Sequence, residues 1–130
     1  MIVGIGIDII NIKRFEKTII KYGDRFIKKC FLQSEIQRSE DRRNTIHSYA
    51  KRYAAKEACA KALGTGLAKG VNWKDIEVRN NNLGKPILIL HNKAIKILNQ
   101  ISSKKARIEV SLSDEKNYAI SNVIIFKDEK

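Results

Sequence analysis

The chain has 130 residues, a formal net charge of +12 and a sequence pI of about 9.9. This length suits one domain, and hydrophobic residues at 43% are a globular proportion, which argues against disorder as the main state. The excess of Lys and Arg repels basic partners and favours polyanions, namely nucleic acid, acidic proteins, phosphate-rich cofactors or anionic lipid. Composition does not choose among these four.

The N-terminal segment and the cysteines indicate the compartment. The longest apolar run, Met1 to Ile10, is about half of what spans a bilayer. Lys13 and Arg14 follow that run, whereas a secretory signal carries its basic residues before it. Cys30 and Cys59 have neither CxxC spacing nor a nearby His pair, which disfavours a zinc site. We expect two free thiols rather than a disulfide, in a soluble cytoplasmic protein.

The segment from Ile2 to Ile10 is rich in β-branched residues and predicts a buried strand. Because side chains alternate along a strand, its two faces differ in composition. One face carries only β-branched residues, Val3, Ile5, Ile7 and Ile9. The other face carries Gly4, Gly6, Asp8 and Ile10. The two glycines leave room beside the carboxylate of Asp8.

Two helices are predicted after this strand. Asn11 offers an N-cap for the first helix. The apolar residues that this helix is expected to turn inward are Ile12, Phe15, Ile19 and Ile20. A second, short helix is predicted from about Asp24 to Cys30. Its expected apolar contacts are Phe26, Ile27 and Phe31.

Two more helical segments follow in the chain. Ser34 is expected to cap a third, polar segment that runs to Arg42. The strongest helical pattern covers about Asn44 to Leu63, and Gly64 in the C′ position is expected to end it. The basic helices are therefore grouped in the first half of the chain.

The second half of the chain alternates short strands with one helix. In chain order the prediction is a strand from Lys74 to Arg79, a turn at Asn80-Asn81-Asn82 with Gly84, a strand from Pro86 to Leu90, an amphipathic helix from Lys93 to Ile101, and strands from Ala106 to Leu112 and Tyr118 to Phe126. We find neither a repeat of solenoid period nor a low-complexity linker. The pattern predicts one compact α+β domain over residues 1–130.

Glu57 interrupts an apolar stripe of the long helix. At 100° per residue, a stripe about 80° wide contains Ile46, Ala50, Tyr53 and Ala60, with Glu57 in its middle. A carboxylate on a buried face is costly unless it is paired, protonated or bound to a metal. Lys61 follows one turn later, so a helical ion pair explains Glu57 about as well on spacing alone.

Asp8 raises the same question near the end of the first strand, where a capping or solvated Asp is the commoner case. Two such carboxylates are also a plausible hard-cation site, since Mg²⁺ favours one or two protein carboxylates plus substrate phosphates and water.

The segment Asn82 to Pro86 places a glycine beside a lysine. Backbone N–H groups and an ammonium can then approach an anion together, although a type I or II turn explains this sequence nearly as well. Asp8, Glu57, Lys61 and Lys85 together suggest a site for a metal-bound pyrophosphate.

These residues resemble the motifs of the 4′-phosphopantetheinyl transferase family. Gly6-Ile7-Asp8-Ile9 matches its Gly-x-Asp motif, and Tyr53 to Gly66 resembles its aromatic-x-x-Lys-Glu-Ala-x-x-Lys-Ala motif. Asn82 to Pro86 resembles the Gly-Lys-Pro loop of the short bacterial type, the holo-[acyl-carrier-protein] synthases, and Val110 to Glu115 resembles their C-terminal segment. The resemblance spans almost the whole chain in the family's order. It implies the transferase fold, in which a small antiparallel sheet packs against the long helix.

The resemblance implies a magnesium-dependent enzyme of fatty acid biosynthesis. Such enzymes transfer the 4′-phosphopantetheine group of coenzyme A to a serine of apo-acyl carrier protein and release adenosine 3′,5′-bisphosphate. Asp8 and Glu57 would hold Mg²⁺ against the coenzyme A pyrophosphate, and Lys61 would meet its phosphates as the third catalytic residue. The loop Gly84-Lys85-Pro86 would line the nucleotide pocket, with Lys85 or Arg52 at the 3′-phosphate.

The resemblance also implies a homotrimer with active sites between protomers. One protomer would contribute Asp8 and Glu57, and its neighbour would help to cover the nucleotide. The proton acceptor stays open among Glu57, a metal-bound water and Glu115. Asp114 stands where many members carry His, so a role of that imidazole does not transfer to this chain.

The helices between Lys13 and Lys29 carry more basic than acidic residues. By resemblance the partner is an acidic acyl carrier protein, and complementary charge mainly raises the encounter rate and fixes orientation. The implied docking residues are Arg14, Lys21, Arg25 and Lys28. For any one of them, a merely solvated basic helix is an equally good explanation.

Two other functions account for part of the sequence. A small nucleic-acid-binding domain is suggested by the pI and by the pairs Arg42-Arg43 and Lys51-Arg52, but it gives no reason for Glu57 on an apolar stripe. A non-catalytic trimeric scaffold would leave Asp8 and Glu57 as structural remnants, and the retention of both with Lys61 argues against it. We expect neither a nucleic acid nor a membrane as partner.

Overall fold

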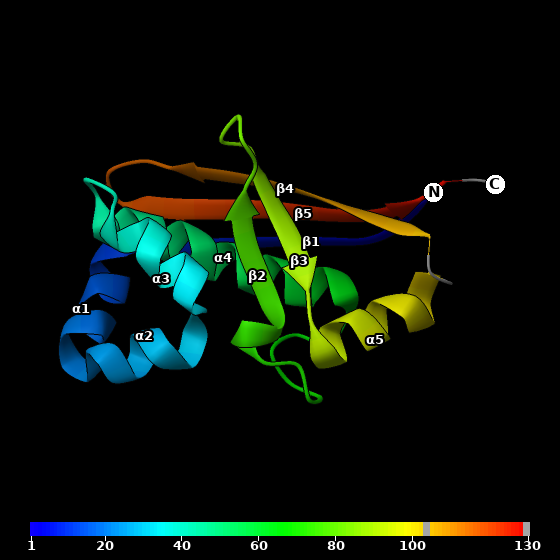
Figure 1. Cartoon of the computed structure of the whole chain (residues 1–130), viewed down its shortest axis with the longest axis horizontal. Helices are drawn as coiled ribbons and strands as arrows, with labels where there is room; N and C mark the ends of the chain where they lie inside the picture. The colour runs from blue at the N-terminus through cyan, green and yellow to red at the C-terminus, as the bar shows by residue number, and fades with distance from the viewer. Residues whose placement is uncertain (103–104, 129–130) are drawn as a thin grey trace.

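Two antiparallel sheets and one long central helix organise the chain (Figure 1). The coordinates are a computed structural model that describes residues 1–102 and 105–128. The larger sheet has the strand order β1-β5-β4, with β1 at Ile2–Asn11, β5 at Tyr118–Lys127 and β4 at Ala106–Asp114. The smaller sheet pairs β2 (Ile76–Asn80) with β3 (Pro86–Leu90). The structure therefore confirms the α+β class, with two sheets where the sequence suggested one.

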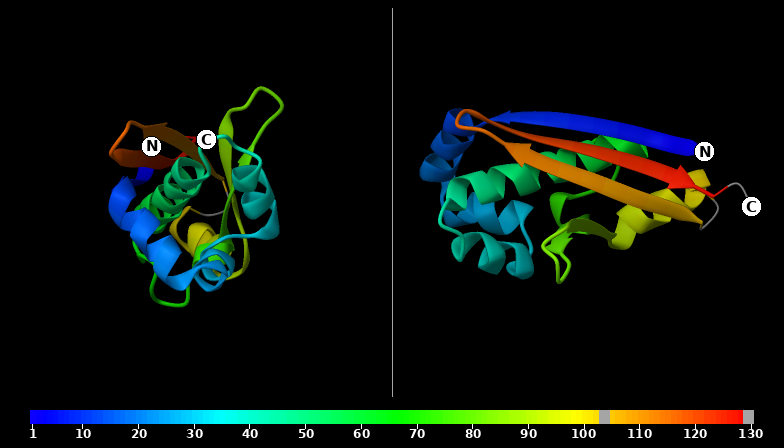
Figure 2. Two further views of the ribbon diagram at one scale, coloured as in Figure 1. Left: turned by 90° about the vertical axis from the view of Figure 1, so that its left-hand side faces the viewer. Right: turned by 90° about the horizontal axis from the view of Figure 1, so that it is seen from above.

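Helix α4 (Thr45–Leu63) lies along one face of the larger sheet and packs against all three of its strands (Figure 2). The Asn44 side chain accepts from the amide of His47 at its start. Gly64 ends the helix with a positive φ of 86°, a conformation that costs glycine little. Both boundaries confirm the sequence prediction. The alanine-rich sequence lets other elements approach this helix closely, and most of its side chains are buried.

The approach of β1 to α4 depends on two glycines. A Cβ built on Gly4 would lie 2.1 Å from the carbonyl oxygen of Ala62, and one built on Gly6 would lie 1.8 Å from that of Ala58. Only hydrogen fits at both positions. The strand can therefore lie directly on the helix backbone, which brings Asp8 next to the helix.

The remaining helices lie at the two ends of α4 (Figure 1). Helices α1 (Ile12–Tyr22), α2 (Asp24–Cys30) and α3 (Gln33–Glu40) surround its N-terminal part, where Phe15, Phe31 and Tyr49 belong to one apolar core. Helix α5 (Asn92–Ser102) packs near its C-terminal part, and a short 3₁₀ helix, η1 (Trp73–Asp75), precedes β2. A second core fills the space among α4, α5 and the two sheets.

Several details of the sequence prediction were wrong. The strand β1 is not buried on both faces, because Ile5, Ile7 and Ile9 are 59%, 55% and 59% exposed on the face away from α4. Ile20 is 76% exposed and does not face the core. Helix α3 begins at Gln33 and ends at Glu40, and Ser34 does not cap it. The Ser34 hydroxyl donates to Glu77 Oε2 at 2.7 Å instead.

Smaller differences concern the ends of the helices and strands. Lys74 belongs to η1 and not to β2, whereas β4 and β5 continue past their predicted ends to Asp114 and Lys127. Cys30 and Cys59 are buried free thiols, as expected. In the part of the chain that the structure describes, no helix is long and apolar enough to cross a bilayer.

Candidate active site

Asp8 and Lys61 meet where β1 passes over the C-terminal half of α4. Lys61 Nζ lies 3.0 Å from Asp8 Oδ1 and also donates to the carbonyl oxygen of Ile7 at 2.9 Å. The second carboxylate oxygen, Asp8 Oδ2, is buried and has no hydrogen-bond partner among the described residues. A buried carboxylate oxygen without a donor is costly, so this atom is available to a cation or a ligand.

Glu57 lies one turn before Lys61 on α4 and is half-buried. Burial raises the pKa of its carboxyl group, and the negative charge of Asp8 raises it further, while Lys61 lowers it. The spacing along the helix suggested an ion pair between Glu57 and Lys61. In the structure Lys61 forms its ion pair with Asp8 instead. Because the two negative charges act on each other, a bound cation would relieve their repulsion.

The chemistry of this site fits Mg²⁺. It offers hard oxygen ligands, one of them unpartnered, beside a lysine that can neutralise a phosphate. Among the described residues, no group of three or more His, Cys, Asp or Glu gathers in a metal-binding arrangement. A metal held by Asp8 and Glu57 would therefore keep water or phosphate oxygens as its other ligands, which suits Mg²⁺ better than zinc.

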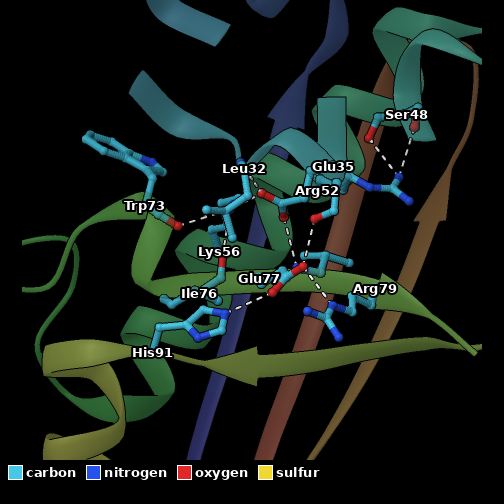
Figure 3. Close-up of polar contacts among 12 residues, drawn as sticks. Leu32, Glu35, Ser48, Arg52, Lys56, Trp73, Ile76, Glu77, Arg79 and His91 are labelled. Carbon is cyan, nitrogen blue, oxygen red and sulfur yellow. Dashed lines mark hydrogen bonds and ion pairs between the residues drawn. The ribbon is translucent and has the colours of Figure 1, made fainter. Parts of the chain in front are cut away.

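A separate site, rich in positive charge, lies over the N-terminal half of α4. It is a cavity of about 490 Å³ lined by the basic residues Arg38, Arg42, Arg43, His47, Lys51 and Arg52, together with polar and loop residues. Arg52 is buried, and it donates to Ser48 Oγ at 2.9 Å (Figure 3). It also donates to Asn80 Oδ1 at 2.9 Å, while its Nε has no partner in the described structure. This density of fixed positive charge suits a phosphate-bearing ligand.

The loop that joins β2 to β3 contributes part of this cavity. Gly84 and Pro86 line it, whereas Lys85 forms an ion pair with Glu109 of β4 at 2.9 Å. The Asn81 side chain accepts from the amide of Lys85 and holds the loop in its turn. The structure thus brings Arg52, Gly84 and Pro86 together, but it places Lys85 neither in this cavity nor beside Asp8 and Glu57.

His47, which the sequence analysis did not assign to a site, contacts Asp114. His47 Nδ1 is 2.6 Å from Asp114 Oδ2, and Lys51 Nζ is 3.5 Å from Asp114 Oδ1. Burial acts to raise the pKa of Asp114, but the His47 hydrogen bond and the Lys51 charge outweigh it and lower the pKa. Both partners belong to α4 and line the same cavity. Glu115, by contrast, is exposed on the turn between β4 and β5.

The four basic residues named for partner docking share one end of the molecule. Arg14 and Lys21 are exposed on α1, and Arg25 and Lys28 are exposed on α2. Of these four, Arg25 lines a hollow of about 310 Å³, together with Tyr22, Phe26 and Lys29. The surface therefore combines positive charge with aromatic side chains.

Comparison with known proteins identifies the family. A family model for the 4′-phosphopantetheinyl transferase superfamily matches residues 4–123. Over 127 residues the chain is 48% identical to a holo-[acyl-carrier-protein] synthase of Bartonella tribocorum and 49% identical to one of Agrobacterium fabrum. These alignments cover 96% of this chain and 96% and 95% of those proteins.

Solved structures agree with this assignment. The holo-[acyl-carrier-protein] synthase of Neisseria meningitidis superposes with a TM-score of 0.86 at 32% identity, covering 98% of this chain and 100% of that chain. The Bacillus anthracis holo-(acyl-carrier-protein) synthase, in complex with CoA (3′,5′-ADP), superposes with a TM-score of 0.80 at 36% identity, covering 98% and 99%. With its motifs, fold and near full-length similarity in accord, the chain belongs to the 4′-phosphopantetheinyl transferase superfamily, among the holo-[acyl-carrier-protein] synthases.

Proposed function

We propose that this chain transfers the 4′-phosphopantetheine group of coenzyme A to a serine of apo-acyl carrier protein, with Mg²⁺ as cofactor. The observation that carries the proposal is the cluster of Asp8, Glu57 and Lys61, in which one buried carboxylate oxygen has no partner within the described residues. Holo-acyl carrier protein and adenosine 3′,5′-bisphosphate would be the products. The transfer belongs to fatty acid biosynthesis.

The residues of the cluster have distinct tasks. Asp8 and Glu57 would hold Mg²⁺, which supplies Lewis-acid stabilisation of the charge on the pyrophosphate when it is bound. Lys61, whose side chain is half-exposed, can turn its ammonium toward a phosphate while remaining near Asp8. Glu57, half-buried within the cluster, also stands as a proton acceptor for the serine hydroxyl, as would a water held by the metal. Glu115 lies exposed on a turn and lacks this environment.

The arginine-lined cavity is the proposed site for the nucleotide part of coenzyme A. Arg52 and the Gly84–Pro86 loop contribute to it, in keeping with the bound CoA (3′,5′-ADP) of the Bacillus anthracis relative. We favour Arg52 over Lys85 for the 3′-phosphate, since Arg52 lines the cavity and Lys85 pairs with Glu109. Lys85 would reach a phosphate only after giving up that ion pair.

We propose that the active form is a homotrimer with its sites between protomers. The cavity lining includes none of Asp8, Glu57 and Lys61, so one chain offers the metal cluster and the nucleotide cavity as separate parts. The outer face of β1 exposes Ile5, Ile7 and Ile9 on an edge strand of the sheet. Burial of these side chains against a second copy would be favourable and would bring surfaces of neighbouring protomers together.

The basic end formed by α1 and α2 is the proposed docking surface for acyl carrier protein. Arg14, Lys21, Arg25 and Lys28 are exposed on these two helices, and Arg25 lines the hollow that Tyr22 and Phe26 also line. An acidic partner would be steered by the charge and held by the aromatic side chains. The two buried free thiols suit a reducing compartment, and we place the reaction in the cytoplasm.

Mass spectrometry of the carrier tests the proposed reaction. Purified protein with coenzyme A, Mg²⁺ and apo-acyl carrier protein should add a phosphopantetheine mass to the carrier. A carrier variant in which the acceptor serine is alanine should stay unmodified, and omission of Mg²⁺ with a chelator present should stop the transfer. If no mass is added while a known transferase modifies the same carrier, the proposed activity is wrong.

A further inference from the structure

A buried ion pair joins α4 to α3 one residue away from Glu57 (Figure 3). Lys56 Nζ lies 2.7 Å from Glu35 Oε1, and both side chains are 0% exposed. The ammonium of Lys56 also donates to the carbonyl oxygens of Trp73 and Ile76, at 3.0 and 2.6 Å. All three ammonium protons therefore have acceptors within the protein.

Glu35 extends this network to two further segments. Its Oε1 accepts from the amide of Leu32 at 2.9 Å, and its Oε2 accepts from the amide of Val78, also at 2.9 Å. The pair thus connects the start of α3, the strand β2 and the turn η1 to one point on α4. Segments that are 17 to 43 residues apart in the sequence are joined at this point.

The same network fixes Trp73, whose ring lies against the face of α4 that carries Glu57. Lys56 binds the backbone carbonyl of Trp73, and the Trp73 ring stacks on Tyr53, with 6.1 Å between the ring centroids. Tyr53 lies one turn before Glu57 on the helix, so the stacked rings lie on the side of α4 that carries Glu57, and the buried Trp73 Nε1 has no hydrogen-bond partner among the described residues. Lys56 therefore contacts the wall of the site through Trp73 and is covalently adjacent to Glu57.

Stability alone is a weak reason for such a pair. Desolvation of two charges costs several kcal/mol per ion, and apolar side chains of similar volume often give equal or greater stability. A buried ion pair has strict geometry, however, because every proton and lone pair needs its partner. The pair is therefore well suited to setting the rotation of α4 about its axis, which decides where Glu57 points.

We propose that Lys56 and Glu35 are positioning residues that hold Glu57 and Trp73 in the arrangement needed for metal binding. Neither residue touches substrate or metal; each acts through the helix and the Trp73 ring. The inference rests on the proposed metal role of Glu57. It gives a role to Lys56, which belongs to the Lys-Glu-Ala motif, and adds Glu35, which lies outside the motifs.

Manganese quenching of Trp73 fluorescence tests the inference without the reaction. Trp73 is the only tryptophan of the chain, and paramagnetic Mn²⁺ bound beside Glu57 should quench it in a saturable way. Loss of an outer-shell partner commonly costs about 10- to 100-fold in metal affinity or activity, so Lys56→Met should weaken Mn²⁺ binding by at least about 10-fold. Glu57→Gln should abolish the saturable quenching. Lys96→Met, which removes an exposed lysine from α5, is the matched control and should bind Mn²⁺ as the wild type does.

Steady-state kinetics supply the second measurement. Lys56→Met should lower kcat by about 10- to 100-fold and change KM for the carrier much less. The rings of Trp73 and Tyr53 do contact α2, but the docking residues themselves are exposed on the outer surface of α1 and α2. A general loss of fold would change both constants and the circular dichroism spectrum. A folded Lys56→Met variant with wild-type Mn²⁺ affinity and kcat would overturn the inference, as would absence of saturable quenching in the wild type.

Glu35→Gln tests the positioning role of the pair if Lys56→Met fails to fold. Glutamine keeps the size of Glu35 and an acceptor for Lys56 but removes the charge and the acceptor for the Val78 amide. It should retain the fold and weaken Mn²⁺ binding by about 10-fold, and unchanged binding would overturn the inference. If the carrier stays unmodified while Mn²⁺ quenching depends on Glu57 and Lys56, the proposed reaction fails and the positioning role stands.

Discussion

The backbone of Gly6 lies against the carbonyl oxygen of Ala58, so close that a Cβ on Gly6 would be 1.8 Å from that oxygen. This contact lets β1 lie directly on the backbone of α4. Asp8 follows two residues later on the same face of the strand and therefore reaches the helix near Lys61. The Gly-x-Asp motif is thus a geometric device that brings a strand carboxylate to a helix.

Gly6→Ala should separate the strand from the helix. The added methyl group meets backbone atoms of Ala58 and Ala62, which cannot rotate away as a side chain would. We expect a loss of at least about 2 kcal/mol in the free energy of unfolding and a fall in transferase activity in the protein that remains folded. Urea unfolding and the carrier mass assay measure the two effects.

Gly64→Ala is the matched control for this substitution. Gly64 has a positive φ, but nothing lies within 4 Å of an added Cβ, so only backbone strain of about 1 kcal/mol is expected. Equal losses of stability in the two variants would show that close approach of β1 to α4 is not the reason for Gly6.

Glu57→Gln should abolish transfer and yet stabilise the metal-free protein. The folded-state pKa of Glu57 is raised by burial and by Asp8, so its ionised form destabilises the fold above its ordinary value of 4.5. The neutral amide removes this penalty, and because the group is half-exposed we expect a gain below about 1 kcal/mol at pH 7. Thermal unfolding in chelator should show a higher Tm. A lower Tm, or activity within about 10-fold of the wild type, would contradict the assignment.

The transferase activity of the wild type should decline as the pH is lowered, because the pKa of Glu57 is raised. A raised pKa means that Glu57 takes up a proton at a higher pH than an ordinary glutamate, and the protonated group cannot hold a cation. As the pH falls, transfer should decline before ordinary surface glutamates titrate, and extra Mg²⁺ should shift the decline to lower pH. A decline that is independent of the Mg²⁺ concentration would exclude Glu57 as its cause.

Arg14→Glu should impair recognition of the carrier more than that of coenzyme A. Arg14 is exposed on α1, and charge reversal there replaces attraction for an acidic surface with repulsion. We expect KM for the carrier to rise by about 10-fold at low salt and KM for coenzyme A to stay within about two-fold. The control is Lys96→Glu, with the same sign of charge reversal on α5. Equal effects of Arg14→Glu on both substrates would refute a docking role.

Ile7→Glu should break the proposed trimer. Ile7 is 55% exposed on the outer face of β1, where a carboxylate is readily solvated in a monomer but buried in an assembly. Light scattering should give the mass of a trimer for the wild type and of a monomer for the variant, with transfer lost in the monomer. Ile95→Glu, at an exposed isoleucine of α5, should leave the mass unchanged. A monomeric and active wild type would contradict the proposal.

Local patterns were enough to predict most elements and the central carboxylates. Asn44 and Gly64 gave both ends of α4, since capping depends on residues within one turn of the helix. The position of Glu57 on an apolar stripe indicated an unusual carboxylate, because 3.6-residue periodicity needs no tertiary information. The predicted cap at Ser34 was wrong because its hydroxyl donates to Glu77, a residue 43 positions away along the chain.

Most helices and strands, the family motifs and the excess of positive charge could be predicted from residue patterns along the chain. Tertiary packing alone set the pairings of Lys61 with Asp8, of Lys85 with Glu109 and of His47 with Asp114. It also placed the charged side chains of Lys56 and Glu35 fully inside the protein, against what their residue types suggest. Each of these contacts joins residues more than 20 positions apart, whose meeting depends on how whole elements pack rather than on local periodicity.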